Sequence, residues 1–164
     1  MKTLLLLRHA KSSWSDPLLR DFDRPLNERG LKAAPLVGRF MLQRKIQPGL
    51  VLCSPAERAR QTAALVSEAA QLTAAPRFEE RIYEASAIRL LEIISQIEET
   101  VDEAMLVGHN PGLEDLLMVL TGEARRMPTA ALARIALDIE KWSEVREDAG
   151  RLDWLVKPKE LAND

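Results

Sequence analysis

Each of the two histidines of the chain lies just past the end of a short apolar run, where a side chain could take part in chemistry. The run at residues 3–7 is followed by Arg8 and His9, and the run at residues 104–107 leads to His109. If both runs are parallel strands of one sheet, their carboxyl ends meet at one edge, which is where such sheets bind ligands. One histidine alone is as often structural as functional. Here both histidines of the chain lie at the ends of predicted strands, and one of them is preceded by arginine. This arrangement favours a functional site.

A third apolar run, at residues 50–53, ends at the sequence SPAER. Ser54 suits the N-cap of a helix, Pro55 suits its first position, and Glu57 completes a capping box. The free N–H groups of this helix would then face the same edge of the sheet, where they favour an anion. Arg58 lies in the first turns of the helix and can reach the same space.

Arg8, Arg58 and the two histidines together predict a site for a phosphoryl group. The planar guanidinium of arginine donates paired hydrogen bonds to phosphate oxygens. A neutral imidazole, with a pKa near ~6.5, can act as a nucleophile, and flanking arginines disfavour its protonated form. Because His109 can donate to the phosphoryl oxygens, stabilisation of the transferring group would be mostly electrostatic. The residues therefore predict phosphoryl transfer, with His9 as the nucleophile.

The rest of the chain alternates apolar runs typical of strands with longer amphipathic segments typical of helices. The predicted strands are residues 3–7, 50–53, 104–107, 133–137 and 151–156, and the predicted helices are residues 28–45, 56–72, 88–100 and 113–120. Pro35 is expected to kink the first helix or to shift its start. This alternation implies right-handed crossovers and a mostly parallel sheet with helices on both faces, which is a three-layer α/β/α sandwich.

Length and composition favour one globular domain over residues 1–164, because no repeat or linker divides the chain. A net charge of −2 argues against a nucleic-acid partner. No run approaches the ~18 apolar residues of a membrane span, and the short apolar start is better explained as a strand than as a signal peptide. The single cysteine, Cys53, excludes an internal disulfide. We expect a cytoplasmic protein, of a size that suits a bacterium.

The motifs resemble those of the histidine phosphatase superfamily, whose fold is phosphoglycerate mutase-like. LLLLRHAKSSW is similar to the opening R-H motif, SPAERARQTA is similar to an S-x-x-x-R-A-x-x-T motif, and VGHNPGLEDLL carries the second histidine. The segments DFDRPLNERG, HNPGLEDL, MPTAAL and KPKEL are similar to the branch of SixA-type phosphohistidine phosphatases. The resemblance spans nearly the whole chain in the order of the family.

The resemblance implies that His9 becomes phosphorylated and that Arg8, Arg58 and His109 complete the phosphate pocket. It implies no metal and no other cofactor. Arg24, in DRPLNERG, matches an arginine of the branch that is expected to face the substrate.

Glu80 is the candidate general acid. The segment from Glu80 to Tyr83 resembles one whose glutamate protonates the leaving group, although Glu84 stands here where that motif usually has glycine. A glutamate that simply faces solvent is an equal alternative. General acid catalysis typically contributes ~10²–10⁴-fold, so its absence would favour activated leaving groups such as the imidazole of phosphohistidine.

The chain shows no insertion that would close over a small substrate, so we expect an open pocket. An open pocket favours phosphohistidine on another protein as the substrate. A small-molecule phosphomonoesterase or mutase of the same fold, and a phosphoprotein-binding module without turnover, remain alternatives. A monomer is compatible with the sequence, which does not otherwise predict the oligomeric state.

Two other catalytic classes are disfavoured by spacing and charge. A cysteine-dependent phosphatase needs a longer loop than the four residues that separate Cys53 from Arg58. Catalytic zinc sites commonly use three protein ligands, whereas this chain has two histidines, and the neighbouring arginines would repel a cation.

Overall fold

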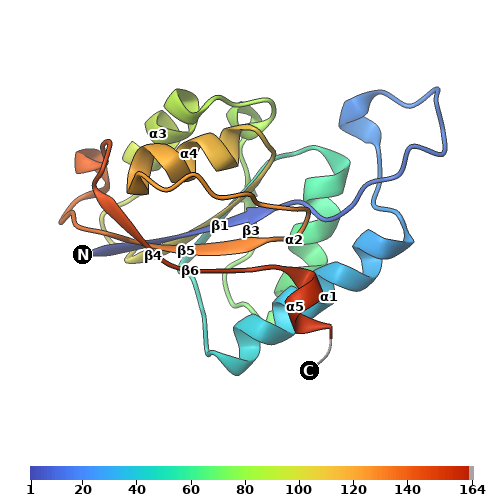
Figure 1. The fold of residues 1–164 in the computed structure, drawn as a ribbon, viewed down its shortest axis with the longest axis horizontal. Coiled ribbons are helices and arrows are strands. Elements are labelled where there is room, and N and C mark those ends of the chain that lie inside the picture. The colour runs from blue at the N-terminus through green and yellow to red at the C-terminus, as the bar shows by residue number, and fades with distance from the viewer. Residues whose placement is uncertain (163–164) are drawn as a thin grey trace.

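A computed structural model describes residues 1–162 and arranges them in three layers (Figure 1). The middle layer of these residues is a six-stranded sheet with the lateral order β3-β2-β4-β1-β5-β6. Its strands are β1 (Lys2–Arg8), β2 (Leu50–Cys53), β3 (Pro76–Phe78), β4 (Glu103–Gly108), β5 (Leu132–Leu137) and β6 (Gly150–Val156). Strands β1 to β4 are parallel, β5 is antiparallel to β1, and β6 is antiparallel to β5. The prediction of a mostly parallel α/β sheet is confirmed.

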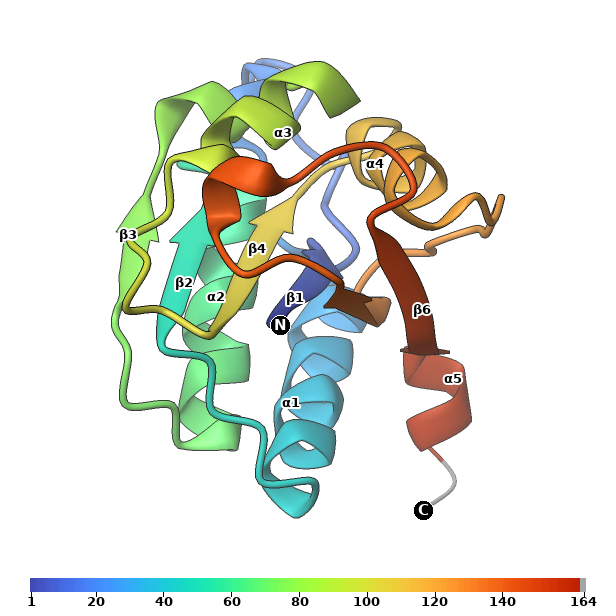
Figure 2. The same cartoon turned by 90° about the vertical axis from the view of Figure 1, so that its left-hand side faces the viewer.

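Helices cover both faces of the sheet (Figure 2). One face carries α1 (Glu28–Gln43), α2 (Glu57–Ala70) and α5 (Pro158–Leu161), and the other carries α3 (Ala87–Ser95) and α4 (Gly112–Thr121). Short 3-10 turns occur at η1 (Asp21–Asp23), η2 (Glu80–Ile82) and η3 (Trp142–Glu144).

The central strand β1 explains why two cores form. Successive side chains of a strand point to opposite faces. Leu5 and Leu7 pack in the cluster of α1 and α2, whereas Leu4 and Leu6 pack in the cluster of α3 and α4. All four are fully buried, which is why this strand is a continuous apolar run rather than an alternating one.

Some predicted element boundaries are corrected. Helix α1 begins at Glu28 as predicted, where the side chain of Asn27 accepts a hydrogen bond from Gly30 N at 2.9 Å; it continues through Pro35 without a shifted start and ends at Gln43 instead of residue 45. Helix α3 ends at Ser95 and not at residue 100, because Gln96 N and Ile97 N donate to carbonyls three residues earlier. Strand β3 was not among the predicted strands; it is short and lies at the edge of the sheet.

The sheet topology brings distant segments to one rim. Strands β1, β2 and β4 all end there, and Leu132 pairs with both Leu7 and Val156, so β5 begins and β6 ends at the same rim. In Figure 1 the segment between β1 and α1 extends beyond this carboxyl end of β1. No helix within residues 1–162 is long and apolar enough to cross a membrane.

Candidate active site

The two histidines lie side by side at the rim. Strands β1 and β4 pair in register up to Arg8 and Gly108, and His9 N donates to Gly108 O at 3.1 Å. The next residue on each strand is a histidine, and the two ring centroids are 5.1 Å apart with an angle of 51° between the planes. The parallel pairing of the two strands therefore creates the histidine pair that the sequence predicted.

The hydrogen bonds of His9 define which ring nitrogen can react. Nδ1 lies 2.7 Å from Ala10 O, and a carbonyl oxygen only accepts, so Nδ1 carries the proton. Nε2 then keeps its lone pair and accepts a hydrogen bond from Arg58 Nε at 3.4 Å. Burial and, to a smaller extent, the charges of Arg58, Arg8 and Arg24 together lower the pKa of His9 to about 4, against the raising effect of the Ala10 hydrogen bond. His9 is therefore a neutral imidazole at pH 7.

Arg58 is anchored by a residue that the sequence analysis did not single out. Its Nη1 donates to Asp21 O at 2.7 Å, and its Nη2 donates to the Asp21 carboxylate at 3.0 Å. The Arg58 side chain is 7% exposed. The Thr62 hydroxyl donates to Arg58 O and accepts from Ala10 N, which ties the start of α2 to the loop after β1. Asp21 and Thr62 thus fix the guanidinium beside His9.

Arg24 binds the same carboxylate. Its Nε and Nη2 donate to Asp21 Oδ1 at 3.2 and 3.0 Å, and its Nη1 donates to Ser12 Oγ at 2.8 Å. Trp14 stacks on the guanidinium at 3.5 Å. Burial raises the pKa of Asp21, but hydrogen bonds from Tyr83 and the two arginines outweigh it and hold the pKa at about 2. The spacing of Asp21 and Arg24, three residues apart, was the signal available in the sequence.

His109 is oriented by Ser54. Its Nε2 lies 2.7 Å from Ser54 Oγ, and that oxygen also accepts a hydrogen bond from Ala56 N at 3.2 Å. The Ser54 hydroxyl can donate its hydrogen to His109 Nε2, and in that tautomer of His109 the ring proton is on Nδ1. Burial, then the neighbouring His9 and Arg58, lower the pKa of His109 to about 3. Tyr83 packs edge-on against the ring and donates to Asp21 Oδ2 at 2.6 Å.

This use of Ser54 corrects the predicted start of α2. The helix begins at Glu57 with Ala56 at the N-cap, and no side chain caps it. Ser54 stands two residues earlier, because its hydroxyl is hydrogen-bonded to His109 and to Ala56 N.

Buried hydrogen-bonding atoms without a partner gather at this site. Arg8 donates through Nη1 to Met127 O at 3.0 Å, but its Nε has no partner. His109 Nδ1 and Asn110 Oδ1 are also buried without a partner, and the one other such side-chain atom within residues 1–162 is Ser67 Oγ. Two unused donors, on Arg8 and His109, are what an anionic ligand would satisfy.

The site is less open than the absence of an insertion suggested. His9 is 7% exposed, and the η1 segment contacts Arg58 and Tyr83 through Asp21. One wall is therefore made by the short segment before α1.

The remaining candidate residues lie apart from the histidine pair. Glu80 is exposed, and no hydrogen bond or ion pair within the described part of the chain connects it to the site. Cys53 is fully buried, and burial raises the pKa of its thiol to about 12, so it is not a thiolate at neutral pH. Residues 1–162 contain no group of three or more His, Cys, Asp or Glu side chains that could hold a metal ion.

Fold and site together define the class of protein. The family model for the histidine phosphatase superfamily (branch 1) matches residues 4–119. The chain belongs to this superfamily.

Individual relatives place the chain more closely. It is similar to the SixA protein of Agrobacterium tumefaciens, with 32% identity and a TM-score of 0.82 over 96% of this chain and 98% of that one. A structure of the protein histidine phosphatase SixA complexed with tungstate has the same fold, with a TM-score of 0.84 and 23% identity over 97% of this chain and 99% of that one. A Mycobacterium tuberculosis (strain H37Rv) protein of uncharacterised function is 38% identical over 114 residues, which are 70% of this chain and 69% of that protein.

Proposed function

We propose that the protein is a metal-independent phosphatase that forms a phosphohistidine on His9 and removes phosphate from phosphohistidine in other proteins. The observation that carries this proposal is the state of His9. Its Nδ1 proton is held by Ala10 O, its pKa is about 4, and its Nε2 lone pair lies beside the guanidinium of Arg58. A neutral, oriented imidazole next to fixed cations has what nucleophilic attack on a phosphoryl group requires.

The reaction follows from these contacts. His9 Nε2 attacks phosphorus, a P–N bond forms, and the bond from phosphorus to the leaving group breaks with its electron pair going to that group. Arg58, Arg8 Nε and His109 Nδ1 donate to the three outer oxygens as the charge on them changes. Water then attacks the phosphorus of phospho-His9, which releases inorganic phosphate and restores the neutral imidazole. The arginines supply the positive charge that a metal supplies in other phosphatases.

The leaving group decides the proposed substrate class. No acid in the described part of the chain contacts the histidine pair, and Glu80 is exposed and unconnected to it. An imidazole leaving group needs less help than an alkoxide, because transfer from one histidine to another exchanges similar P–N bonds. The likeness to the Agrobacterium SixA protein at 32% identity supports the same substrate class.

The test is phosphate release from a phosphohistidine-bearing protein in the presence of EDTA. We expect release by the wild type and none above background by His9→Ala. The matched control is Ser67→Ala, a substitution at a hydroxyl outside the site, which should keep the wild-type rate. Equal release by wild type and His9→Ala would remove His9 as the nucleophile, and loss of wild-type activity in EDTA would contradict metal independence.

The same assay separates the alternatives. Turnover of an aryl phosphate or a phosphosugar, without release from the phosphoprotein, would make the protein a small-molecule phosphomonoesterase or mutase. Tight binding of the phosphoprotein without release would make it a binding module.

The buried thiol of Cys53, which forms no disulfide, supports a reducing compartment such as the cytoplasm as the place where the protein acts.

A further inference from the structure

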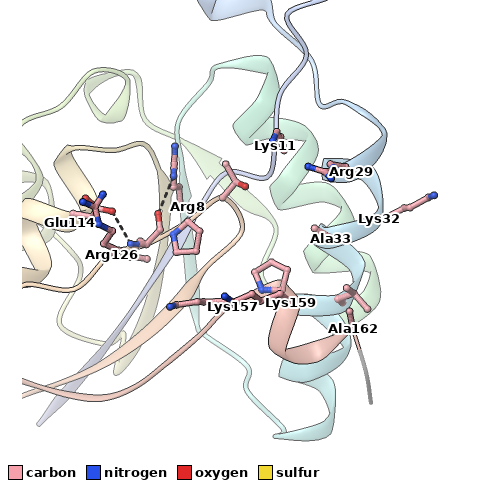
Figure 3. Close-up of a pocket in the computed structure, with 15 residues that line it drawn as sticks. Arg8, Lys11, Arg29, Lys32, Ala33, Glu114, Arg126, Lys157, Lys159 and Ala162 are labelled. Carbon is pink, nitrogen blue, oxygen red and sulfur yellow. Dashed lines mark hydrogen bonds between the residues drawn. The ribbon is translucent and has the colours of Figure 1, made fainter.

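A basic groove opens beside the histidine pair, with a volume of about 810 Å³ (Figure 3). Its lining comes from the end of β1 with the loop after it, the first half of α1, the start of α4, the loop before β5, and α5 with the residue before it. Its walls carry seven basic side chains and one acidic one. These charged residues are Arg8, Lys11, Arg29, Lys32, Arg126, Lys157, Lys159 and Glu114.

The charge of this groove differs from that of the whole chain. The protein has 23 basic and 25 acidic residues, yet the groove is lined by seven basic residues and one acidic residue. Glu114 is already engaged, because its Oε2 accepts from Met127 N at 2.8 Å and from Asn110 Nδ2 at 2.9 Å. None of the seven basic residues forms an ion pair with a carboxylate within residues 1–162, and Arg8 donates to a backbone carbonyl. Such a concentration of unpaired cations creates a positive potential that attracts anions.

The floor of the groove is apolar. Ala33 and Leu36 of α1, Pro128 of the loop and Pro158 of α5 line it. A ligand that matches the groove therefore combines several negative charges with at least one apolar side chain. Nucleic acid and inorganic polyphosphate would match the rim of the groove but not this floor.

The groove and the phosphate pocket share Arg8. The unpartnered Nε of Arg8 belongs to the site beside His9, and the same side chain lines the groove, where its bond to Met127 O is drawn in Figure 3. The sheet topology explains the continuity, because α5 follows the end of β6 and the loop precedes β5 at the same rim as His9. A substrate polypeptide whose phosphoryl group lies at His9 can thus extend into the groove.

We infer that the basic groove binds an acidic segment of the phosphoprotein substrate, next to the phosphorylated side chain in that protein. The segment would place carboxylates against the lysines and arginines and an apolar side chain against the floor. This inference rests on the proposed function and adds to it the feature that selects the partner. The cations are spread over four segments: the end of β1 with the following loop, α1, the loop before β5, and α5 with the residue before it. This spread favours an extended acidic peptide over a small ester, which would contact the cations of only one or two segments.

Binding of a labelled peptide tests the groove without any turnover. The probe is a short fluorescein-labelled peptide of alternating glutamate and leucine, compared with the same peptide in which glutamine replaces glutamate, and affinity is measured by fluorescence anisotropy. The groove variant is Lys32→Glu with Lys159→Glu. The matched control, Arg39→Glu with Lys141→Glu, reverses the same number of exposed charges, one on α1 beyond the groove and one before η3. Thermal unfolding of each variant checks that it folds.

We expect the wild type to bind the acidic peptide and not the glutamine peptide. The groove variant should lose about tenfold or more in affinity, and the control variant less than about threefold, given the usual size of exposed charge pairs. Raising the salt from about 50 to about 300 mM should weaken binding, because the Debye length shortens. Equal losses in both variants, equal affinity for both peptides, or tighter binding of an oligonucleotide or polyphosphate would overturn the inference. Because the readout is binding, it stays valid if the phosphohistidine assay fails, so the two failures are distinguishable.

Discussion

The carboxylate of Asp21 accepts a hydrogen bond from Arg58 Nη2 at 3.0 Å, while Nε of the same guanidinium donates to His9 Nε2 at 3.4 Å. The main-chain oxygen of Asp21 accepts a second bond from the same guanidinium at 2.7 Å. A 3-10 turn in the loop after β1 thus fixes the cation that faces the nucleophile. Asp21 positions Arg58, and we do not assign it a role in proton transfer, because its pKa of about 2 keeps it ionised.

Asp21→Asn should lower kcat/KM by about tenfold, or ~1.4 kcal/mol, because Arg58 and Arg24 lose their shared charged partner. The measurement is steady-state kinetics on a phosphohistidine-bearing protein. Asp16→Asn is the control and should have little effect, because the Asp16 side chain lies in the same exposed segment and accepts a hydrogen bond only from Leu18 N. A positioning role also predicts that Asp21→Glu restores part of the loss. If Asp21→Asn and wild type have equal kcat/KM, the anchoring role is wrong.

The protonation of His9 can be followed directly, because the chain has only two histidines. NMR titration of the two imidazoles should show that His9 titrates near pH 4 and not near ~6.5. Arg58→Gln should raise the His9 midpoint, since one of the charges that disfavour imidazolium is removed. A His9 midpoint close to that of a free histidine would contradict its burial among arginines.

The same shifts set the pH dependence of stability. The pKa values of His9 and His109 are lower in the folded state than in the unfolded chain, so between about pH 6.5 and pH 4 the unfolded state binds more protons. The free energy of unfolding should therefore fall as the pH is lowered through this window, and urea denaturation at several pH values measures it. His109→Gln should reduce the slope. A stability that does not change between pH 6.5 and 4 would show that the buried histidines are not neutral.

Ser54→Ala should lower kcat by about tenfold with a smaller change in KM, because His109 loses the hydroxyl that orients its ring. Ser67→Ala is the matched control, since the buried Ser67 hydroxyl has no hydrogen-bond partner. Ser54→Thr keeps a hydroxyl and should recover part of the rate. Equal kcat for Ser54→Ala and Ser67→Ala would show that His109 does not depend on Ser54.

Glu80→Gln tests the candidate general acid. Since Glu80 is exposed and the structure shows no contact from it to the histidine pair, we expect less than a ~3-fold change with phosphohistidine as the leaving group. Turnover of alkyl and aryl phosphates should be compared in the same variant. A loss of ~10²-fold or more on alkyl phosphates alone would assign the general-acid role to Glu80.

The site residues that could be predicted from the sequence are those whose positions are set by the ends of strands. His9 and His109 follow apolar runs, and the parallel pairing of the neighbouring strands β1 and β4 brings the two positions together. Arg8 and Arg58 were predicted for the same reason, one beside a strand end and the other in the helix that follows a strand. The fold class followed from the same alternation of strands and helices.

The features that the sequence did not predict depend on loops and on segments that meet only in the folded chain. Asp21 lies in a 3-10 turn with no periodic pattern, so only its spacing to Arg24 pointed to an ion pair. Ser54 has the type and position of an N-cap, and only the structure shows its hydroxyl bonded to His109. The basic groove could not be predicted, because Lys32, Arg126 and Lys159 come from three segments that meet only after the sheet has formed.

The central claim, covalent transfer to His9, is tested most directly by trapping the intermediate. The wild type is mixed with a phosphohistidine-bearing protein, quenched in alkali within the first turnover, digested and analysed by mass spectrometry for the site of phosphate. We expect an acid-labile phosphate on the peptide that contains His9, and none on that peptide in His9→Asn or on the peptide that contains Cys53. Phosphate on Cys53, or complete turnover without phosphorylation of the enzyme, would contradict the account.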